Sequence, residues 1–406
     1  MSRERERIDN IYCGMCTLSV FRSLLEDEVI APLMELMEEQ AEHGKFNVNK
    51  YSQFAAQLYK HEANLSRYIL SRVLEDENFY ICGTASGKVF DEVIVTAVQN
   101  ELYALQELSQ VTPELLRYGY YRICPLPEWR TEFIDFAAEY RKRLENIGCC
   151  GYGKFASSVM FVYRDGELLP VKNPDKQRLS ELYGYERERG EVVANTIALV
   201  EGKPARNVLL YGDAGTGKSS TVKAVVNEFA HRGLRLIELG KEQLRDIPLI
   251  IDSISNNPLK FIIFIDDLTF TSGEDCFGSL KAALEGSVSA KSENALIYAT
   301  SNRRHLVRES FSDRNGDDIH RSDTMQETLS LSARFGLRVN FQRPDKKDYI
   351  AIASQLARLY GVEMSDEELA LRAEQFAVQG NGRSPRTAKQ FLISTGINFK
   401  EPSDFQ

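Results

Sequence analysis

The sequence predicts an α/β protein built on a five-stranded parallel sheet between helices, with a mostly α-helical domain before it and a small helical lid after it. Three observations support this prediction. Five short apolar runs lie between residues 207 and 341, and helical stretches separate most of them. Roughly the first 150 residues repeat apolar positions at helical spacing, and only helical patterns follow Pro344. We therefore expect three domains, at residues 1–170, 171–343 and 344–406.

The first domain is expected to be helical along most of its length. Segments 51–77 and 89–110 carry apolar residues at helical spacing. Segment 127–148 begins at a proline and ends at a glycine, which is the usual asymmetry of a helix. The period then changes, and Asp165-Gly166 between two short β-prone runs predicts a β-hairpin at the end of the domain.

The second domain supplies the strands of the predicted sheet. Each expected strand is five or six residues long and mostly apolar, as expected where both faces of a sheet are covered. The strands are expected at residues 207–211, 234–239, 261–265, 295–300 and 337–341.

The third domain is expected to be a lid of three helices. The first follows Pro344. Ser365 with Glu368 forms a capping box that begins the second, and Ser384-Pro385 begins the third.

Composition and charge exclude some classes of protein. The 406 residues, 43% of them hydrophobic, are enough for a large core. A formal net charge of −9 argues against a protein that coats nucleic acid by bulk electrostatics, although a local basic patch remains open. Segment 303–321 mixes five Arg with four acidic residues and is not a basic stripe.

The N-terminal segment and the cysteines indicate a cytoplasmic protein. Arg and Glu alternate at the start and no small-residue cleavage site follows, so we expect neither a signal peptide nor a membrane span. Seven cysteines, an odd number, suggest a reducing compartment. Cys13 with Cys16 forms a C-x-x-C that a zinc site would have to combine with Cys149-Cys150. The helical setting favours ordinary thiols there, and the zinc alternative stays open.

The segment GDAGTGKSS, residues 212–220, lies between a predicted strand and a predicted helix and fits G-x-x-x-x-G-K-[ST]. Its glycines let backbone N–H groups face a phosphate chain. Lys218 adds charge at the β- and γ-phosphates, and Ser219 can ligate Mg²⁺. The residues expected at the phosphates are Gly212, Asp213, Ala214, Gly215, Thr216, Gly217, Lys218, Ser219 and Ser220.

Two aspartates end the third predicted strand, in FIIFIDDLTF, residues 261–270. Ligands bind at the carboxyl edge of a parallel sheet, and a phosphate-binding loop needs an acidic partner on a neighbouring strand. We therefore assign Asp266 to Mg²⁺ and Asp267 to the polarisation of an attacking water molecule. No guanine-reading N-K-x-D follows these strands, and we expect ATP with Mg²⁺.

The order of five segments resembles that of AAA+ ATPases over roughly residues 177–400. The segments are LSELYGYERERGEVVANT, GDAGTGKSS, FIIFIDDLTF, LIYATSN and SLSARFGL. More narrowly, the chain is similar to a bacterial group of uncharacterised AAA+ ATP-binding proteins, through LYGYE, TGKSS, ATSNRRHL and LSLSARFGL.

This resemblance implies roles for polar residues outside the glycine-rich segment. Asn302 matches the position that senses the γ-phosphate and orients water, and a polar residue at a strand end is the alternative. Arg334 matches an arginine finger that reaches the ATP of a neighbouring subunit, and a surface arginine is the alternative. Both are assigned to catalysis together with Lys218 and Asp267.

The resemblance also implies contacts around the nucleotide. Arg383 matches the sensor arginine of the lid, with Arg386 as its rival one helical turn away. Tyr183 and Gly184 match the stretch that lines the adenine pocket, although Tyr183 could equally be a core residue.

One departure from the family pattern affects the expected rate. Many AAA+ proteins have Asp-Glu where this chain has Asp266-Asp267, and the shorter side chain is expected to slow water activation. An Asp-Asp pair also resembles the replication-initiator and helicase-loader branch. Residues 240–251 lack an aromatic-glycine loop, which disfavours a motor that threads polypeptides.

Three hypotheses follow for function. The first is a cytoplasmic AAA+ ATPase with the slow turnover expected from Asp267, which oligomerises through Arg334 and selects an unidentified protein partner with its N-terminal domain. The second is a nucleotide-gated scaffold or loader that binds ATP with little hydrolysis. A small-molecule kinase is the weakest, because the finger and the lid would then have no purpose.

Overall fold

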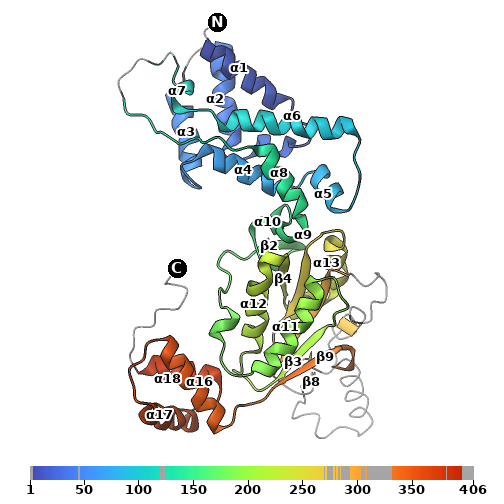
Figure 1. Cartoon of the computed structure of the whole chain (residues 1–406), viewed down its shortest axis with the longest axis vertical. Coiled ribbons are helices and arrows are strands. Elements are labelled where there is room, and N and C mark those ends of the chain that lie inside the picture. Colours follow the sequence, from blue (N-terminus) through green and yellow to red (C-terminus); the bar gives the residue numbers. More distant parts are fainter. Residues whose placement is uncertain are drawn as a thin grey trace. The chain divides into compact units, whose positions relative to one another are not determined.

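The computed structural model describes residues 3–43, 46–118, 120, 124–268, 270–271, 278, 280–281, 284, 293–302, 307–308, 332–380 and 382–395. The mixed-charge segment 303–321 therefore lies outside the described residues except for two positions. The chain divides into two compact units, Met1–Ser157 and Ser158–Gln406, and each is described by itself (Figure 1).

The first unit is helical, as the spacing of its apolar residues predicts. Asn47, Asn64 and Asn78 each cap a helix by accepting backbone N–H groups of its first turn. Its helices are α1 (Arg3–Cys16), α2 (Ile30–His43), α3 (Val48–Tyr59), α4 (Leu65–Glu75), α5 (Phe79–Ala85), α6 (Glu92–Ser109), α7 (Pro113–Leu116), α8 (Phe136–Glu145), α9 (Ile147–Cys150) and α10 (Lys154–Ser157).

One hydrophobic core holds the first unit together. The ring of Trp129 packs against Phe54 with ring centroids 4.9 Å apart, and its indole N–H donates to Val111 O at 2.9 Å. The carboxylate of Glu101 is buried on α6 and accepts the backbone N–H groups of Val20 and Phe21. A buried charge that accepts several N–H groups fixes the loop after α1 to α6.

The second unit contains a parallel sheet with helices, which confirms the α/β class. The strand order is β2-β1-β4-β5-β7-β3-β9, and neighbours are parallel except β1 with β2. The strands are β1 (Met160–Arg164), β2 (Glu167–Pro170), β3 (Val208–Gly212), β4 (Leu234–Leu239), β5 (Lys260–Ile265), β7 (Ala295–Ser301) and β9 (Leu337–Phe341), with a separate pair β6 (Phe270–Thr271) and β8 (Val307–Arg308).

The expected number of five strands is wrong, because the sheet has seven. The hairpin of β1 and β2 joins it, and β1 pairs in parallel with β4 from Met160↔Leu236 to Val162↔Glu238. The predicted place of this hairpin at the end of the N-terminal domain is wrong, because the structure divides the compact units between Ser157 and Ser158 and the hairpin lies in the second unit. The partner of β4 at this edge is β1, which lies far away in the sequence, and local sequence patterns do not predict such a pairing.

Helices cover the sheet and connect its strands. Figure 1 shows α11 (Glu186–Val200) and α12 (Lys218–Phe229) side by side over one face of the strands. A further helix, α13 (Ile247–Ile254), separates β4 from β5 in sequence.

The lid has the three predicted helices. They are α16 (Lys346–Leu359), α17 (Asp366–Gln379) and α18 (Pro385–Ser394). Ser365 accepts the N–H of Glu368 at 3.3 Å and so caps α17, and Ser384 caps α18. The three helices share a hydrophobic cluster of their own, which includes Tyr349 and Phe391.

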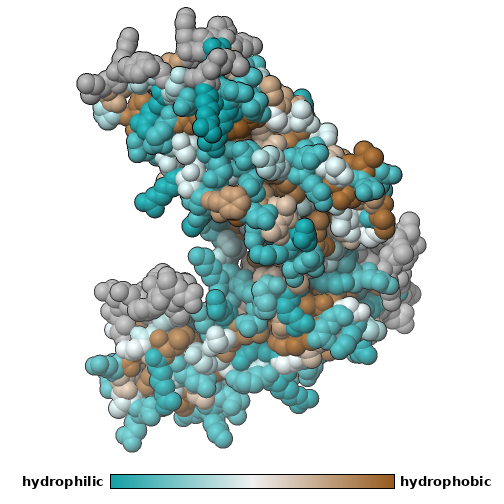
Figure 2. Space-filling model, turned by 45° about the horizontal axis from the view of Figure 1, so that its top comes forward, coloured by the Kyte–Doolittle hydropathy of each residue, from teal (hydrophilic) through white to brown (hydrophobic). Residues whose placement is uncertain are grey.

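The face of the molecule that Figure 2 shows is largely hydrophilic. Figure 2 shows teal residues over most of the visible face, with brown patches separated by hydrophilic ones. Among the described residues, no helix combines the length and the apolar character needed to span a membrane.

Candidate functional site

The glycine-rich loop, residues 212–219, joins β3 to α12. Gly212, Gly215 and Gly217 have φ values of 132°, 77° and 89°, which side chains rarely allow. A Cβ on Gly212 would also lie 2.2 Å from the carbonyl oxygen of Phe341. The loop therefore needs glycine for its backbone shape and for its close approach to β9.

The amine of Lys218 lies inside this loop. Its Nζ donates to Asp213 O at 2.7 Å, to Gly212 O at 3.2 Å and to Asn302 Oδ1 at 3.0 Å. Burial lowers the pKa of Lys218 to about 8, and the nearby aspartates oppose that shift only in part. The structure thus holds a cation among neutral acceptors at the centre of the loop.

The side chains of Ser219 and Asp266 meet across the sheet edge. The Ser219 hydroxyl donates to Asp266 Oδ1 at 2.6 Å, and the Thr300 hydroxyl donates to the same oxygen at 2.5 Å. Hydroxyl and carboxylate oxygens are ligands that Mg²⁺ prefers. Thr300 is not among the predicted site residues, although it is the penultimate residue of β7, beside β5, and a polar residue near a strand end is the same signal that predicts Asp266.

Asp267 and Asn302 form the second half of the site. Asn302 donates its Nδ2–H to Asp267 Oδ1 at 2.8 Å, while Asp267 donates its backbone N–H to Thr300 Oγ1 at 2.9 Å. Asp267 has φ of 50°, a left-handed conformation that Asp adopts more readily than most residues. Lys218, Asn302 and Asp267 are therefore connected in one chain of hydrogen bonds.

These groups surround a cavity of about 310 Å³ beside the loop. It is lined by Ala214, Gly215, Thr216, Gly217, Lys218, Ser219, Ser220, Asp266, Asp267, Thr300, Asn302 and Arg386. The loop supplies backbone N–H groups, Lys218 supplies positive charge, and Ser219 with Asp266 supplies hard oxygen ligands. The arrangement can hold a phosphate chain together with a hard divalent cation.

The donor set fits Mg²⁺ in particular. One hydroxyl and one carboxylate leave several coordination positions to water and to phosphate oxygens, which is how Mg²⁺ is usually held. Within the described part of the chain, no three His, Cys, Asp or Glu side chains are grouped as metal ligands. Cys13 and Cys16 are exposed free thiols on α1.

The two candidate lid arginines lie in different places. Arg383 forms an ion pair with Glu374 of α17, with Nη2 and Oε1 2.5 Å apart. Arg386 instead lines the 310 Å³ cavity, and its backbone N–H donates to Gly215 O at 3.2 Å. Of the two residues, the structure brings only Arg386 to the loop.

A smaller cavity of about 220 Å³ adjoins the loop between the core and the lid. Tyr183, Tyr185 and the lid residues Leu356 and Tyr360 line it. Gly184 is not part of this lining, and a Cβ on it would lie 2.6 Å from Ile352 Cδ1. The expected contact of Tyr183 is thus beside the loop, whereas Gly184 serves the packing of the lid.

Asp213 and Arg334 both lie apart from the cavity lining. The Asp213 carboxylate accepts the backbone N–H of Arg343 at 3.0 Å, and the two side chains are paired at 3.5 Å. Arg334 precedes β9, whose carboxyl end at Phe341 pairs with Gly212. Arg334 is thus near the end of β9 remote from its own loop.

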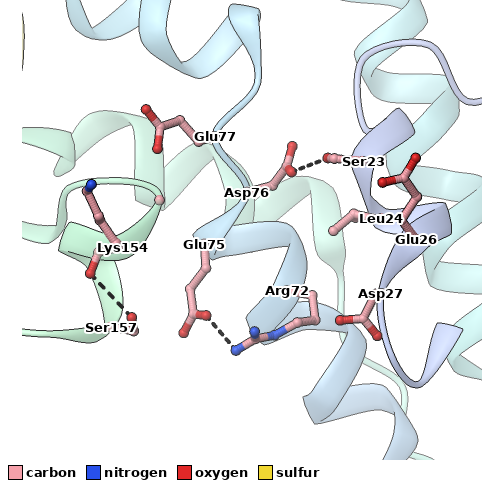
Figure 3. Close-up of a pocket in the computed structure, with 11 residues that line it drawn as sticks. Ser23, Leu24, Glu26, Asp27, Arg72, Glu75, Asp76, Glu77, Lys154 and Ser157 are labelled. Carbon is pink, nitrogen blue, oxygen red and sulfur yellow. Dashed lines mark hydrogen bonds and ion pairs between the residues drawn. The ribbon is translucent and has the colours of Figure 1, made fainter. Parts of the chain in front are cut away.

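A separate cavity of about 400 Å³ belongs to the first unit. Figure 3 shows Arg72 paired with Glu75, 2.5 Å apart, and Ser23 donating to Asp76. Further carboxylates face it, together with Lys154. It lacks the glycine-rich backbone and the buried cation that distinguish the site in the second unit.

Comparison with known proteins gives one match. A family model described as "Protein of unknown function (DUF815)" matches residues 156–396, more than half of the 406 residues. The matched segment begins two residues before the second compact unit and includes the whole glycine-rich loop. No curated protein matches the chain.

Proposed function

The chain belongs to the DUF815 family, and on this premise we propose that it is an ATP-binding protein of the AAA+ type that hydrolyses ATP slowly. The observation that carries the proposal is a pair of hydrogen-bonded contacts between the loop and the ends of β5 and β7. Lys218 joins Asn302 and Asp267, while Ser219 joins Asp266. These are the contacts a Mg²⁺–ATP site needs around a phosphate chain.

Each residue then has a separate task. The backbone N–H groups of the loop and the Lys218 amine bind the β- and γ-phosphates. Ser219 and Asp266 would hold Mg²⁺, which neutralises phosphate charge when it is bound. Asp267 accepts a hydrogen bond from the attacking water, and Asn302 keeps its carboxylate in place.

A nucleotide-gated scaffold is the second candidate, and one observation favours it. The Asp267 carboxylate already accepts a hydrogen bond from Asn302, and the side chain is one methylene shorter than Glu. A short, tethered carboxylate polarises water less well, so turnover would be slow. In either case the partner that responds to ATP is expected to be a protein selected by the N-terminal unit, and the active form an oligomer.

Asp266→Asn and Asp267→Asn are a matched pair that tests the assignment. Asp266→Asn should raise the Mg²⁺ concentration needed for turnover about tenfold or more, because a metal-directed charge is removed. Asp267→Asn should bind Mg²⁺–ATP normally and hydrolyse it at least about 100-fold more slowly. Steady-state rates across a Mg²⁺ titration, with ATP affinity from calorimetry, separate the two effects.

Each variant of this pair is the control for the other, because both make the same isosteric change and the two residues are adjacent in the chain. If the two behaviours were exchanged, the roles of the aspartates would be reversed. If neither variant changed ATP affinity, Mg²⁺ dependence or rate, the proposed function would fail.

ATP affinity should fall about tenfold between pH 7.5 and pH 9. The pKa of Lys218 is lowered to about 8, so the amine loses its proton as the pH rises through this range. Phosphates bind the charged amine, and binding must then take up a proton. Calorimetry in buffers of different ionisation enthalpy should detect this uptake. Lys218→Ala should bind weakly at every pH in the range, and an equal slope in that variant would contradict the assignment.

Arg386→Ala should weaken ATP binding about tenfold, whereas Arg383→Ala should change it less than about twofold. Arg386 lines the phosphate cavity, and Arg383 is occupied by Glu374. The two variants remove the same side chain three residues apart, Arg383 just before α18 and Arg386 within its first turn, and so control for each other. A larger loss of ATP affinity with Arg383→Ala than with Arg386→Ala would mean that Arg383 is the lid residue that contacts ATP.

A further inference from the structure

β9 forms one edge of the seven-stranded sheet, with β3 as its neighbour (Figure 1). Two hydrogen bonds define which of its backbone groups face β3. Leu337 donates its N–H to Asn207 O at 3.1 Å, and Phe341 accepts the N–H of Asp213 at 3.0 Å. In-plane backbone groups alternate along a strand, so the odd-numbered residues of β9 face β3.

Arg338 and Asn340 therefore direct their N–H and C=O groups away from the sheet. In the described parts of the chain, no residue hydrogen-bonds to these backbone groups. A strand edge of this kind is a template for another strand unless something covers it.

Open space lies along the same edge. A cavity of about 900 Å³ is lined by Arg338 and Asn340 and by the first residues of α11 and α16. The Oδ1 atom of Asn340 is buried and has no hydrogen-bond partner among the described residues. Buried acceptors are nearly always satisfied in native proteins, so this atom indicates a missing donor. We call this cavity, with the outer side of β9, the edge groove.

The edge groove is acidic. Five carboxylates line it against three guanidinium groups. Two of those guanidinium groups already contact carboxylates, Arg187 with Glu191 at 3.7 Å and Arg343 with Asp213 at 3.5 Å. The five carboxylates belong to Glu186, Glu188, Glu191, Asp345 and Asp348.

Two of these carboxylates are available to a ligand. Glu188 on α11 and Asp348 on α16 form no ion pair with any described residue. Burial raises the pKa of the Tyr185 phenol, and the charges of Glu188 and Asp348 raise it further. Both carboxylates thus act on the same part of the groove, one from each helix.

We propose that the edge groove binds an extended, basic segment of a partner protein, which adds a strand to β9. Backbone groups of the segment pair with Arg338 and Asn340, and its alternate side chains enter the groove. Lysine or arginine at these alternate positions meets Glu188 and Asp348. The proposal concerns a different surface from the ATP site and does not depend on it.

A fluorescent peptide that alternates Lys and Val over seven residues tests the proposal against the full chain. We expect saturable binding by fluorescence anisotropy, weakened by salt. The same peptide with Glu in place of Lys should not bind. N-methylation of alternate backbone nitrogens should reduce affinity at least about tenfold, because it removes strand hydrogen bonds without changing charge.

Variants of the protein locate the binding. The double variant Glu188→Gln/Asp348→Asn should lose affinity about fivefold or more, because it removes both carboxylates that would pair with the basic side chains. Glu363→Gln/Glu367→Gln makes a similar charge change on lid residues outside the groove and should bind as the parent does. Asn340→Pro removes an outward N–H that β3 does not use, and it should abolish binding. Thermal unfolding checks that each variant is folded.

Amide hydrogen exchange measures directly whether the outward backbone groups of β9 are hydrogen-bonded. The amides of Arg338 and Asn340 should exchange fast in the free chain and slow at least about tenfold with the peptide. Slow exchange in the free chain would mean that the chain covers its own edge, and the partner proposal would be overturned. Absence of binding would overturn it too. So would binding that is insensitive to N-methylation and to Asn340→Pro, because it would be bulk charge attraction.

Discussion

Lys218→Ala should weaken ATP binding at least about 100-fold. The variant removes a buried cation that contacts Gly212 O, Asp213 O and Asn302 Oδ1, and these acceptors lie where the phosphates are expected. Hydrogen bonds to a charged group contribute about 1.5–3 kcal/mol each, so the loss of two is enough for this effect. Calorimetric titration with Mg²⁺–ATP measures it.

A matched control lies on the same helix. Lys223 is paired with Glu238 at 3.4 Å and is not part of the cavity, so Lys223→Ala should bind ATP as the parent does. Thermal unfolding of both variants separates a lost contact from a lost fold. Near-normal affinity and turnover in folded Lys218→Ala would remove the basis of the proposed function.

Arg334→Ala should bind ATP normally and hydrolyse it about 10³-fold more slowly, since an arginine finger supplied by a second chain has an effect of that size. The register Leu337↔Val208 to Gly212↔Phe341 puts Arg334 beyond the opposite end of β9 from the loop. Five residues of parallel strand span roughly 15 Å, too far for the side chain to reach its own phosphates. The proposal therefore requires the arginine to act on a neighbouring chain.

Mixing two inactive variants tests this action between chains. A Lys218→Ala chain keeps its Arg334, and an Arg334→Ala chain keeps its loop, so mixed assemblies should recover part of the activity. Activity per chain should also rise with protein concentration. Arg338→Ala, on β9 itself, serves as the control and should stay active. Full activity of dilute Arg334→Ala would make Arg334 an ordinary surface residue.

Local sequence was sufficient for much of the candidate site. The run FIIFI had to be a strand covered on both faces, and Asp266 had to follow it at the carboxyl edge. The contact of Asp266 with Ser219 then follows from two parallel strands ending at the same edge. Thr300 lies near the carboxyl end of β7, so the convergence of parallel strand ends at one edge predicts its place in the site as well.

Other parts of the site depend on packing between distant segments. Arg383 matches the family pattern and Arg386 is its rival, but the expected spacing of one turn on the same helix face is wrong, because Arg383 precedes the N-cap Ser384 and only Arg386 belongs to α18. Only the docking of α18 on Gly215 brings Arg386 to the cavity, while Glu374 of α17 holds Arg383. The spacing of two arginines near the start of a helix does not show which of them will contact another element.

The sequence by itself determined the parallel α/β class, the position of the glycine-rich loop and the pairing of Ser219 with Asp266. These depend on apolar period and on glycine at positive φ, which are properties of short segments. Only the tertiary structure decided that the hairpin of β1 and β2 extends the sheet to seven strands. It also decided that, among the described residues, no strand pairs with the outer side of β9 and that carboxylates line the cavity there. Both follow from which strand edges find partners far away in the chain, and such pairings are set by the packing of the whole unit.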